Sequence, residues 1–271
     1  MLSNDFLDYF YKEYPQIEET FQTELDKSLE PRSRELRFDL VKELNLPSGS
    51  IALDVGCGEG RYAFELAERF GFTVYGSDPV KAHIAICNYE LTKQSTEVQE
   101  RVIFAQSQIT ALSNDSESID LVWCYDVFEH VAELDEAFAE CYRVLKPGGY
   151  MLVYSQFATD KLEPIEAEFM FDTMGFISTS AHPQNIEASY EKIGFKKSKM
   201  IELLSEWEEY SEESSASVGR HILHVSRLLR KPEQYIEQFG ETAYKIKLAD
   251  CFWHIYPMIG KFSPRLYILQ K

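Results

Sequence analysis

The sequence has little positive charge, no paired cysteine motif and no long apolar run, and each shortage excludes a class of protein. Lysine and arginine number 27 against 45 aspartate and glutamate residues, a formal net charge of -18, so the average surface repels nucleic acid and anionic lipid. The five cysteines form neither a Cys-x-x-Cys pair nor a Cys/His zinc pattern. No run reaches the ~18 apolar residues of a membrane span, and the acidic, aromatic N-terminus lacks signal-peptide features. We therefore expect a cytoplasmic protein with reduced thiols, no nucleic-acid partner, no membrane insertion and no metal site.

From residue 51 the chain alternates short β-branched runs with longer amphipathic ones, which is typical of an α/β, doubly wound, mostly parallel sheet. Seven strands are predicted, at 51–55, 73–77, 101–106, 119–124, 150–155, 195–204 and 265–270. Helices are predicted at 61–70, 134–145 and 185–193. We expect an N-terminal helical cover (1–46), an α/β core (47–204), a helical lid inserted before the last strand (205–261) and that strand (262–271). The five acids of 206–213 are interpreted as a solvated helix face or an exposed connection, with an interaction site as the less favoured alternative.

Glycines mark the turn between the first strand and the first helix, where the stretch 53–60 reads LDVGCGEG. Glycine lets the backbone approach a ligand at such a turn. A dinucleotide fingerprint spaces its glycines G-x-G-x-x-G, but here Gly60 comes one residue early and Arg61 holds the usual place. This spacing disfavours a nicotinamide oxidoreductase, and Asp54 suits a ligand that carries an ammonium group.

Asp78 ends the second predicted strand, at the position where a carboxylate accepts hydrogen bonds from both ribose hydroxyls of an adenosine. The alternative is a purely structural role, in which the glycines make only a tight turn and Asp78 caps the helix beginning at Pro79 and Val80. Taken together, the glycine turn and Asp78 favour a cofactor of nucleoside type.

Four stretches in this order resemble the class I S-adenosylmethionine-dependent methyltransferases, especially the branch with ubiquinone/menaquinone, sterol and glycine or sarcosine methyltransferases. They are LDVGCGEGRY (53–62), GSDPV (76–80), IDLVWCYDVFEHV (119–131) and RVLKPGGYMLV (143–153). The resemblance implies a Rossmann-like methyltransferase fold, with S-adenosyl-L-methionine as cofactor and S-adenosyl-L-homocysteine as product. This sequence departs from the family after the third strand, where Ser107-Gln108-Ile109 replaces a Gly-Asp-Ala pattern.

The resemblance, together with the argument above, assigns the cofactor contacts. The expected cofactor-binding residues are Asp54, Gly56, Cys57, Gly58, Gly60, Asp78, Pro79, Gln108, Ile109 and Tyr125. The glycines would line the amino-acid end, Asp78 the ribose and Pro79 the adenine, with the Gln108 amide oxygen as an acceptor for the adenine amine. Tyr11, Tyr14 and Arg34 are candidates to close over the cofactor, or they serve only in packing.

The expected reaction moves a methyl group by in-line displacement to oxygen or nitrogen of a small-molecule acceptor. His130 is the candidate general base for a hydroxyl acceptor, or it only shapes the site. His221, His224 and His254 are further candidate bases. His221 and His224, three residues apart on a predicted helix, could also bind a metal with a third ligand, but surface or packing roles are favoured for all three histidines. Two other functions stay open: carbon methylation of a quinone-, sterol- or polyketide-like substrate, and a cofactor-binding homologue without methyl transfer. The oligomeric state is also open, a homodimer included.

Overall fold

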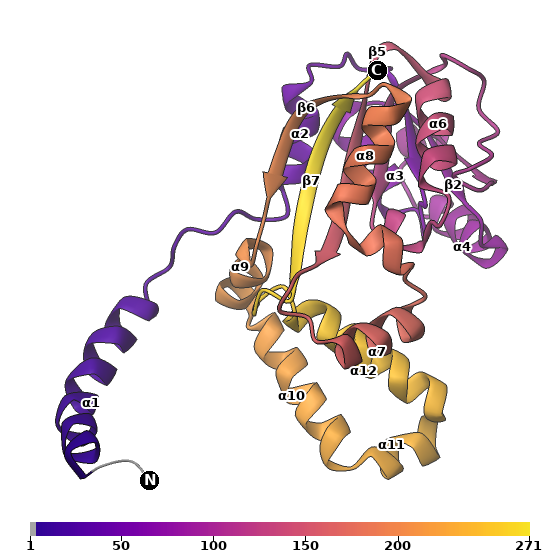
Figure 1. Cartoon of the computed structure of the whole chain (residues 1–271). Coiled ribbons are helices and arrows are strands. Elements are labelled where there is room, and N and C mark those ends of the chain that lie inside the picture. The colour runs from indigo at the N-terminus through magenta and orange to yellow at the C-terminus, as the bar shows by residue number, and fades with distance from the viewer. Residues whose placement is uncertain (1–3) are drawn as a thin grey trace.

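The computed structural model describes residues 4–271, and a seven-stranded sheet forms its centre (Figure 1). The strands are β1 (Ile51–Val55), β2 (Thr73–Asp78), β3 (Val102–Gln106), β4 (Ile119–Tyr125), β5 (Leu145–Ala158), β6 (Lys196–Glu202) and β7 (Phe262–Gln270). They stand in the order β3-β2-β1-β4-β5-β7-β6. β1 to β5 run parallel, and β7 is antiparallel to both β5 and β6. The prediction of a mostly parallel, seven-stranded α/β sheet is confirmed.

Helices surround this sheet, and some of them cover its two faces. They are α1 (Asn4–Leu25), α2 (Leu36–Glu43), α3 (Arg61–Phe70), α4 (Lys81–Leu91), α5 (Thr96–Arg101), α6 (Leu134–Val144), α7 (Pro164–Met174), α8 (Pro183–Ile193), α9 (Glu206–Ser215), α10 (Ser217–Arg230), α11 (Pro232–Phe239) and α12 (Glu241–Ile255), with short 3₁₀ helices η1 (Phe128–His130) and η2 (Ser178–Ala181). One core cluster joins the sheet to α6 and α8, and another joins it to α2, α3 and α9. Figure 1 shows α7 and α10 to α12 beyond the end of the sheet at which β5 ends.

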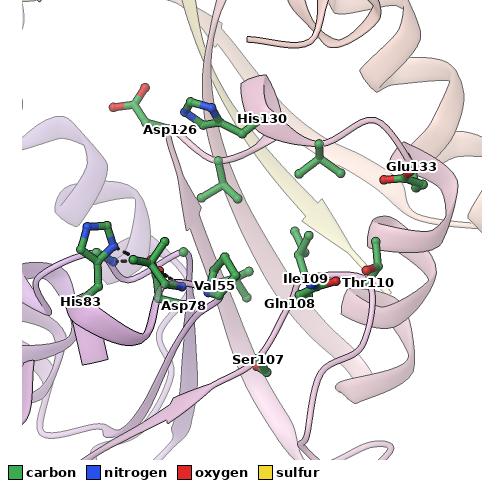
Figure 2. A pocket seen from close by; sticks show the side chains of 16 residues that line it. Val55, Asp78, His83, Ser107, Gln108, Ile109, Thr110, Asp126, His130 and Glu133 are labelled. Carbon is green, nitrogen blue, oxygen red and sulfur yellow. Dashed lines mark hydrogen bonds and ion pairs between the residues drawn. The ribbon is translucent and has the colours of Figure 1, made fainter. Parts of the chain in front are cut away.

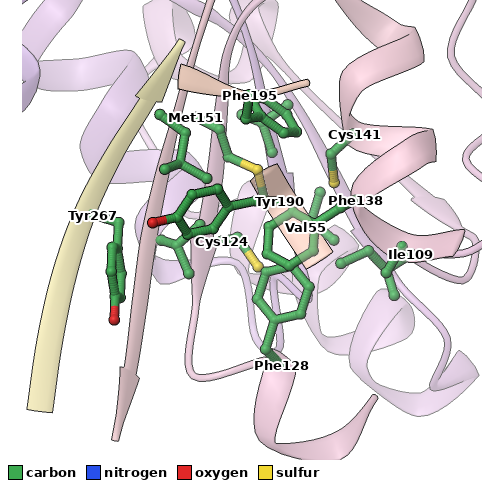
Figure 3. Packing of buried hydrophobic residues seen from close by; sticks show 14 of the residues in the cluster. Val55, Ile109, Cys124, Phe128, Phe138, Cys141, Met151, Tyr190, Phe195 and Tyr267 are labelled. Atoms are coloured by element: carbon green, nitrogen blue, oxygen red, sulfur yellow. The ribbon is translucent and has the colours of Figure 1, made fainter. Parts of the chain in front are cut away.

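Alternation along β4 explains how one strand serves both faces. Leu121, Trp123 and Tyr125 belong to the cluster with α2, α3 and α9, whereas Val122 and Cys124 belong to the cluster with α6 and α8. This is the period of two expected of a strand buried on both sides. Figure 3 shows Cys124 in the cluster with α6 and α8, beside stacked aromatic rings from η1 and α6. The alternation therefore determines to which face of the sheet each side chain at the end of β4 points.

β5 begins earlier than the sequence predicts. The prediction begins the strand at residue 150, but β5 starts at Leu145. Leu145 pairs with Ile119 and Tyr150 pairs with Leu121, so the register shifts between the two pairs. Gly148 has φ +78 within this irregularity, and the glycine pair lets the strand continue past a bulge instead of ending there.

Residues 206–255 between β6 and β7 form the helices α9 to α12, in agreement with the predicted helical patterning. The interpretation of the acidic run as a solvated face is wrong for part of α9, because Trp207 and Glu208 are buried. Glu206 forms an ion pair with Arg32. An acidic run therefore packs against the rest of the protein where an aromatic ring and an arginine meet it.

The N-terminal helix α1 lies apart from the sheet in Figure 1. Tyr11 is 71% exposed and Tyr14 is 45% exposed on this helix. The aromatic residues of α1 thus do not cover the sheet in this arrangement, and their closure over a cofactor stays a prediction. The five cysteines are buried and free, and among residues 4–271 no helix has both the length and the apolar character needed to cross a membrane.

Candidate functional site

The glycine turn between β1 and α3 has three residues in the left-handed region of φ. Gly56, Gly58 and Gly60 have φ of +68, +53 and +86, a conformation that glycine adopts without steric strain. A Cβ at Gly56 would overlap the side chain of Val127, and a Cβ at Gly60 would lie 2.7 Å from a ring atom of Phe104. A Cβ at Gly58 would meet no atom within 4 Å. Packing therefore requires the first and third glycines, whereas the second faces open space.

Asp78 links this turn to the end of β2. Its carboxylate accepts hydrogen bonds from the backbone N–H of Gly58 at 3.0 Å and of Val80 at 2.8 Å, and lies 3.1 Å from Nδ1 of His83. A carboxylate has about four acceptor positions, so one stays free after these three contacts. The bond to Val80 holds the residue before α4, but no side chain caps that helix, so Asp78 faces the pocket without acting as an N-cap.

A pocket of about 600 Å³ opens at the carboxyl ends of β1, β2 and β4 (Figure 2). Its lining residues come from the glycine turn, the ends of β2 and β3 and the segment after β4. They are Val55, Gly56, Gly58, Asp78, Pro79, Val80, His83, Ser107, Gln108, Ile109, Thr110, Asp126, Val127, His130, Val131 and Glu133. The volume is within the range of small-molecule sites, about 300–1,000 Å³, and the place is where open parallel sheets bind ligands.

Seven of the eleven residues predicted for the site line this pocket. They are Gly56, Gly58, Asp78, Pro79, Gln108, Ile109 and His130. Cys57 is buried, and Gly60 packs against Phe104 instead of bordering the pocket. Asp54 is also buried, next to the turn, and Tyr125 faces the other side of β4. The structure thus brings together most of the predicted set and separates Tyr125 from it.

Two carboxyl groups that each have an unpaired buried oxygen flank the glycine turn. Asp54 is 1% exposed, its Oδ2 has no hydrogen-bond partner, and burial raises its pKa to about 8. Asp126 follows β4 directly, lines the pocket and leaves Oδ1 without a partner. Burial, reinforced by the nearby Glu129, raises the pKa of Asp126 well above its ordinary value. Unpaired buried acceptors of this kind are costly, and a bound cation would satisfy them.

His130 ends the helix η1 at the edge of the pocket. Its Nδ1 lies 3.1 Å from the carbonyl oxygen of Gly175, and its ring lies 5.2 Å from the ring of Phe176. Because a carbonyl only accepts, Nδ1 must carry the hydrogen, and the neutral ring then has its free lone pair on Nε2. The loop after α7 therefore fixes the tautomer that a general base would need.

Glu129, the residue before His130, is not among the predicted site residues. Glu129 is 3% exposed, and its Oε1 accepts a hydrogen bond from the backbone N–H of Gln156 at 2.8 Å. Its Oε2 has no partner, and burial raises its pKa. The motif that singled out His130 also contains Glu129, so the signal was present, but nothing local shows that this glutamate turns inward.

An arginine–aromatic cluster lies across β4 from the pocket. The rings of Tyr125 and Tyr154 stack at 4.2 Å, and Trp207 stacks on Tyr154 at 5.0 Å. The guanidinium of Arg34 lies over Trp207 and donates to Glu208 at 2.9 Å. Burial raises the pKa of Glu208 to about 7, and Arg34 opposes that rise. Among these residues the sequence singled out only Tyr125 and Arg34.

The remaining histidine candidates lie together on two helices. His221 and His224 are on α10 and His254 is on α12, with the rings of His221 and His254 stacked at 4.4 Å. All three are absent from the lining of the pocket. Among the histidine candidates, His130 alone borders that pocket.

Comparison with known proteins gives this pocket its context. Residues 53–153 match the family described as "Methyltransferase domain". This part of the chain therefore resembles a methyltransferase domain. The matched residues include the end of β1, the strands β2 to β4, the glycine turn, Asp78 and His130.

A curated relative and two solved structures extend the comparison. The ubiquinone biosynthesis O-methyltransferase of Pseudomonas entomophila (strain L48) is 33% identical over 114 residues, which cover 42% of this chain and 47% of that relative. Phosphoethanolamine N-methyltransferase 2 of Haemonchus contortus, solved with S-adenosyl-L-methionine, aligns at 20% identity and a TM-score of 0.66, covering 91% of this chain and 54% of that one. The [4+2]-cyclase SpnF aligns at 20% identity and a TM-score of 0.67, covering 88% and 80%. The chain spans about half the length of the curated relatives it matches, and the two structures establish the fold.

Proposed function

We propose that this protein is an S-adenosyl-L-methionine-dependent methyltransferase that transfers a methyl group to oxygen or nitrogen of a small molecule. The observation that supports this most is the pocket at the carboxyl ends of β1, β2 and β4, which combines the open face of Gly58 with Asp78 and the unpaired carboxyl oxygen of Asp126. The match of residues 53–153 to the methyltransferase domain family adds to it.

The side chains around the pocket fit the parts of this cofactor in order. Asp54 and Asp126 would receive the ammonium group at the amino-acid end, where their free oxygens lie. The backbone of the turn through Gly56 and Gly58 would approach the same end. Asp78 would hold the ribose through its free acceptor position. Figure 2 shows Gln108 and Ile109 displaced from Asp126 and His130 along the pocket, so Pro79, Gln108 and Ile109 would contact the adenine.

The bound cofactor supplies a methyl group already activated on a sulfonium, so the protein has to position the acceptor, exclude water and accept a proton. An in-line approach needs the acceptor atom about 3 Å from the methyl carbon. For a hydroxyl acceptor, we assign the proton to Nε2 of His130, because the Gly175 carbonyl holds Nδ1 in the donor role. An amine acceptor that arrives neutral needs no base.

We assign the helices of residues 205–261 to a lid over the acceptor, and residues 1–46 to a cover. The ion pairs from Arg32 to Glu206 and from Arg34 to Glu208 support this, since they tie the segment before α2 to α9. A small-molecule acceptor follows from such an enclosure, and nucleic acid is disfavoured by the net charge of -18.

The second candidate is a protein that binds the cofactor but catalyses a different reaction or none. The structural likeness to a [4+2]-cyclase supports keeping it, because a shared fold does not determine chemistry. Methyl transfer to carbon of a quinone-, sterol- or polyketide-like substrate is the third. Labelled cofactor incubated with hydroxyl, amine and carbon acceptors separates the three by whether label moves and to which atom.

Calorimetric titration with S-adenosylmethionine and S-adenosylhomocysteine tests the cofactor step first. Asp78→Asn should weaken binding more than tenfold, because the uncharged amide loses the ribose contact. Asp120→Asn is the matched control, since Asp120 also accepts a backbone N–H, that of Ile51, but at the opposite end of β1. Absence of binding by the wild-type protein would refute the cofactor assignment, and equal losses in both variants would refute the role of Asp78.

A further inference from the structure

Three potential metal ligands meet between α10 and α12, away from the pocket. They are His221 and His224, three residues apart on α10, and Cys251 on α12. One ligand atom of each lies within 4.8 Å of those of the other two. Nδ1 of both histidines is buried and has no hydrogen-bond partner. Cys251 is fully buried as well.

This arrangement is poorly explained by packing alone. Buried polar nitrogens are satisfied in most proteins, and two unsatisfied ones on neighbouring rings, whose centroids lie 6.3 Å apart, call for a partner. Burial lowers the pKa of His221, so its ring is neutral and has a lone pair to donate. Burial raises the pKa of Cys251, and a bound divalent ion would take the thiolate in exchange for the released proton.

We propose that His221, His224 and Cys251 form a binding site for a divalent ion of the zinc class, with the fourth position taken by water. Two imidazoles and one thiolate are a donor set that zinc prefers. Tetrahedral zinc, with Zn–N of about 2.0–2.1 Å and Zn–S of about 2.3 Å, holds its ligand atoms about 3.3–3.7 Å apart. Closing the observed separation takes about 1 Å, which side-chain rotation supplies. The inference stands apart from the proposed methyl transfer, because no pocket residue takes part.

The surroundings of the site suit an ion. Lys247, one turn before Cys251, is neutralised by Asp250 at 2.7 Å. His224 also borders a cavity of about 460 Å³ between α10, α11 and α12, which provides an entry path from solvent. His254 stacks on His221 and holds that ring in place. A bound ion would cross-link α10 to α12, so it would stabilise the helices between β6 and β7.

Metal-free protein without a polyhistidine tag, prepared with a chelator, tests the site with zinc and cobalt(II). We expect one equivalent of zinc to bind, and cobalt(II) to give a thiolate-to-metal charge-transfer band. Cys251→Ser should abolish that band, and His224→Ala should weaken zinc binding more than tenfold. His182→Ala is the control, because His182 is exposed and outside the cluster. It should bind as the wild type does.

Thermal unfolding separates loss of the site from loss of the fold. With chelator, Cys251→Ser and wild type should unfold at similar temperatures. With zinc at about 100 times its Kd, only wild type and His182→Ala should gain about 5 °C in Tm. Wild-type protein that binds no zinc, or a Cys251→Ser variant with an unchanged cobalt band and zinc affinity, would overturn the proposal. Neither result would touch the cofactor assignment, which is measured with S-adenosylhomocysteine.

Discussion

Gly58→Ala adds one methyl group at the point where the glycine turn faces the pocket. The backbone N–H of Gly58 that donates to Asp78 is kept, and the new Cβ meets no protein atom within 4 Å. The substitution therefore leaves the packing of the free protein intact. Because Gly58 lines the pocket, the methyl group occupies space that we assign to the amino-acid end of the cofactor. Binding should suffer more than folding.

The expected losses of stability and of affinity in Gly58→Ala can both be given a magnitude. Gly58 has φ +53, and a left-handed conformation costs a non-glycine residue roughly 1–2 kcal/mol. For a chain of this size that lowers Tm by about 2–8 °C. A methyl group that displaces the ligand weakens the binding of S-adenosylhomocysteine more than tenfold, which is more than about 1.4 kcal/mol. The variant should thus stay folded at 25 °C and lose most of its affinity.

Gly49→Ala separates strain from steric exclusion. Gly49 has φ +87 and open space at its Cβ, but it precedes β1 at the opposite end of the strand. It should lose stability at least as much as Gly58→Ala and keep wild-type affinity. Thermal unfolding and calorimetric titration with S-adenosylhomocysteine measure the two quantities. Wild-type affinity in Gly58→Ala, or equal losses of affinity in the two variants, would refute the assignment of the turn to the cofactor.

Three further changes test the site and its support. His130→Gln should lower kcat for a hydroxyl acceptor by about 10²–10⁴-fold while the Kd for S-adenosylhomocysteine stays within twofold; a decrease of less than tenfold would exclude His130 as the base. Glu129→Gln should raise the free energy of unfolding at pH 8 by on the order of 1–3 kcal/mol. The pKa of Glu129 is about 7 in the folded protein and 4.5 in the reference state, so the stability of the wild type falls as the pH rises from 4.5 through 7. Urea unfolding at pH 5 and pH 8 should show a smaller decline in the variant. Gly56→Ala should destabilise the protein by overlap with Val127, and Val127→Ala in the same chain should restore part of the lost Tm; additive effects would contradict the overlap.

Local patterns were sufficient to predict the sheet. Strand β1 and helix α3 have the predicted bounds, because β-branched runs and the spacing of apolar residues in 61–70 depend on neighbours in sequence. The start of β5 was predicted late, since a turn-like KPGG segment continues in register with β4 as a bulge. Only the neighbouring strand determines that outcome, and it is not visible in the segment itself.

The site was predictable where it follows one motif and not where it depends on packing. Gly58 and Asp78 stand at strand ends, so parallel topology alone brings them together. The orientation of Tyr125 could have been found from the alternation in β4, which puts it on the side of Trp123 and away from the pocket. The burial of Glu129 and the proximity of His221 to Cys251 depend on packing between segments that are distant along the chain. Residue spacing within one segment does not predict such features.

The end of β4 divides the protein into a part that would bind the cofactor and a part that would select the acceptor. Tyr125 points to the arginine–aromatic cluster, whereas Asp126, the next residue, lines the pocket. On the cluster side, Arg34 and Glu208 join the segment before α2 to α9, so the walls there come from chain segments outside the motif-bearing strands. Under the proposed function, the motifs within residues 53–153 would therefore describe the cofactor side, and the helices between β6 and β7 would select the acceptor. Substitutions in those helices should change acceptor preference without changing the affinity for S-adenosylhomocysteine.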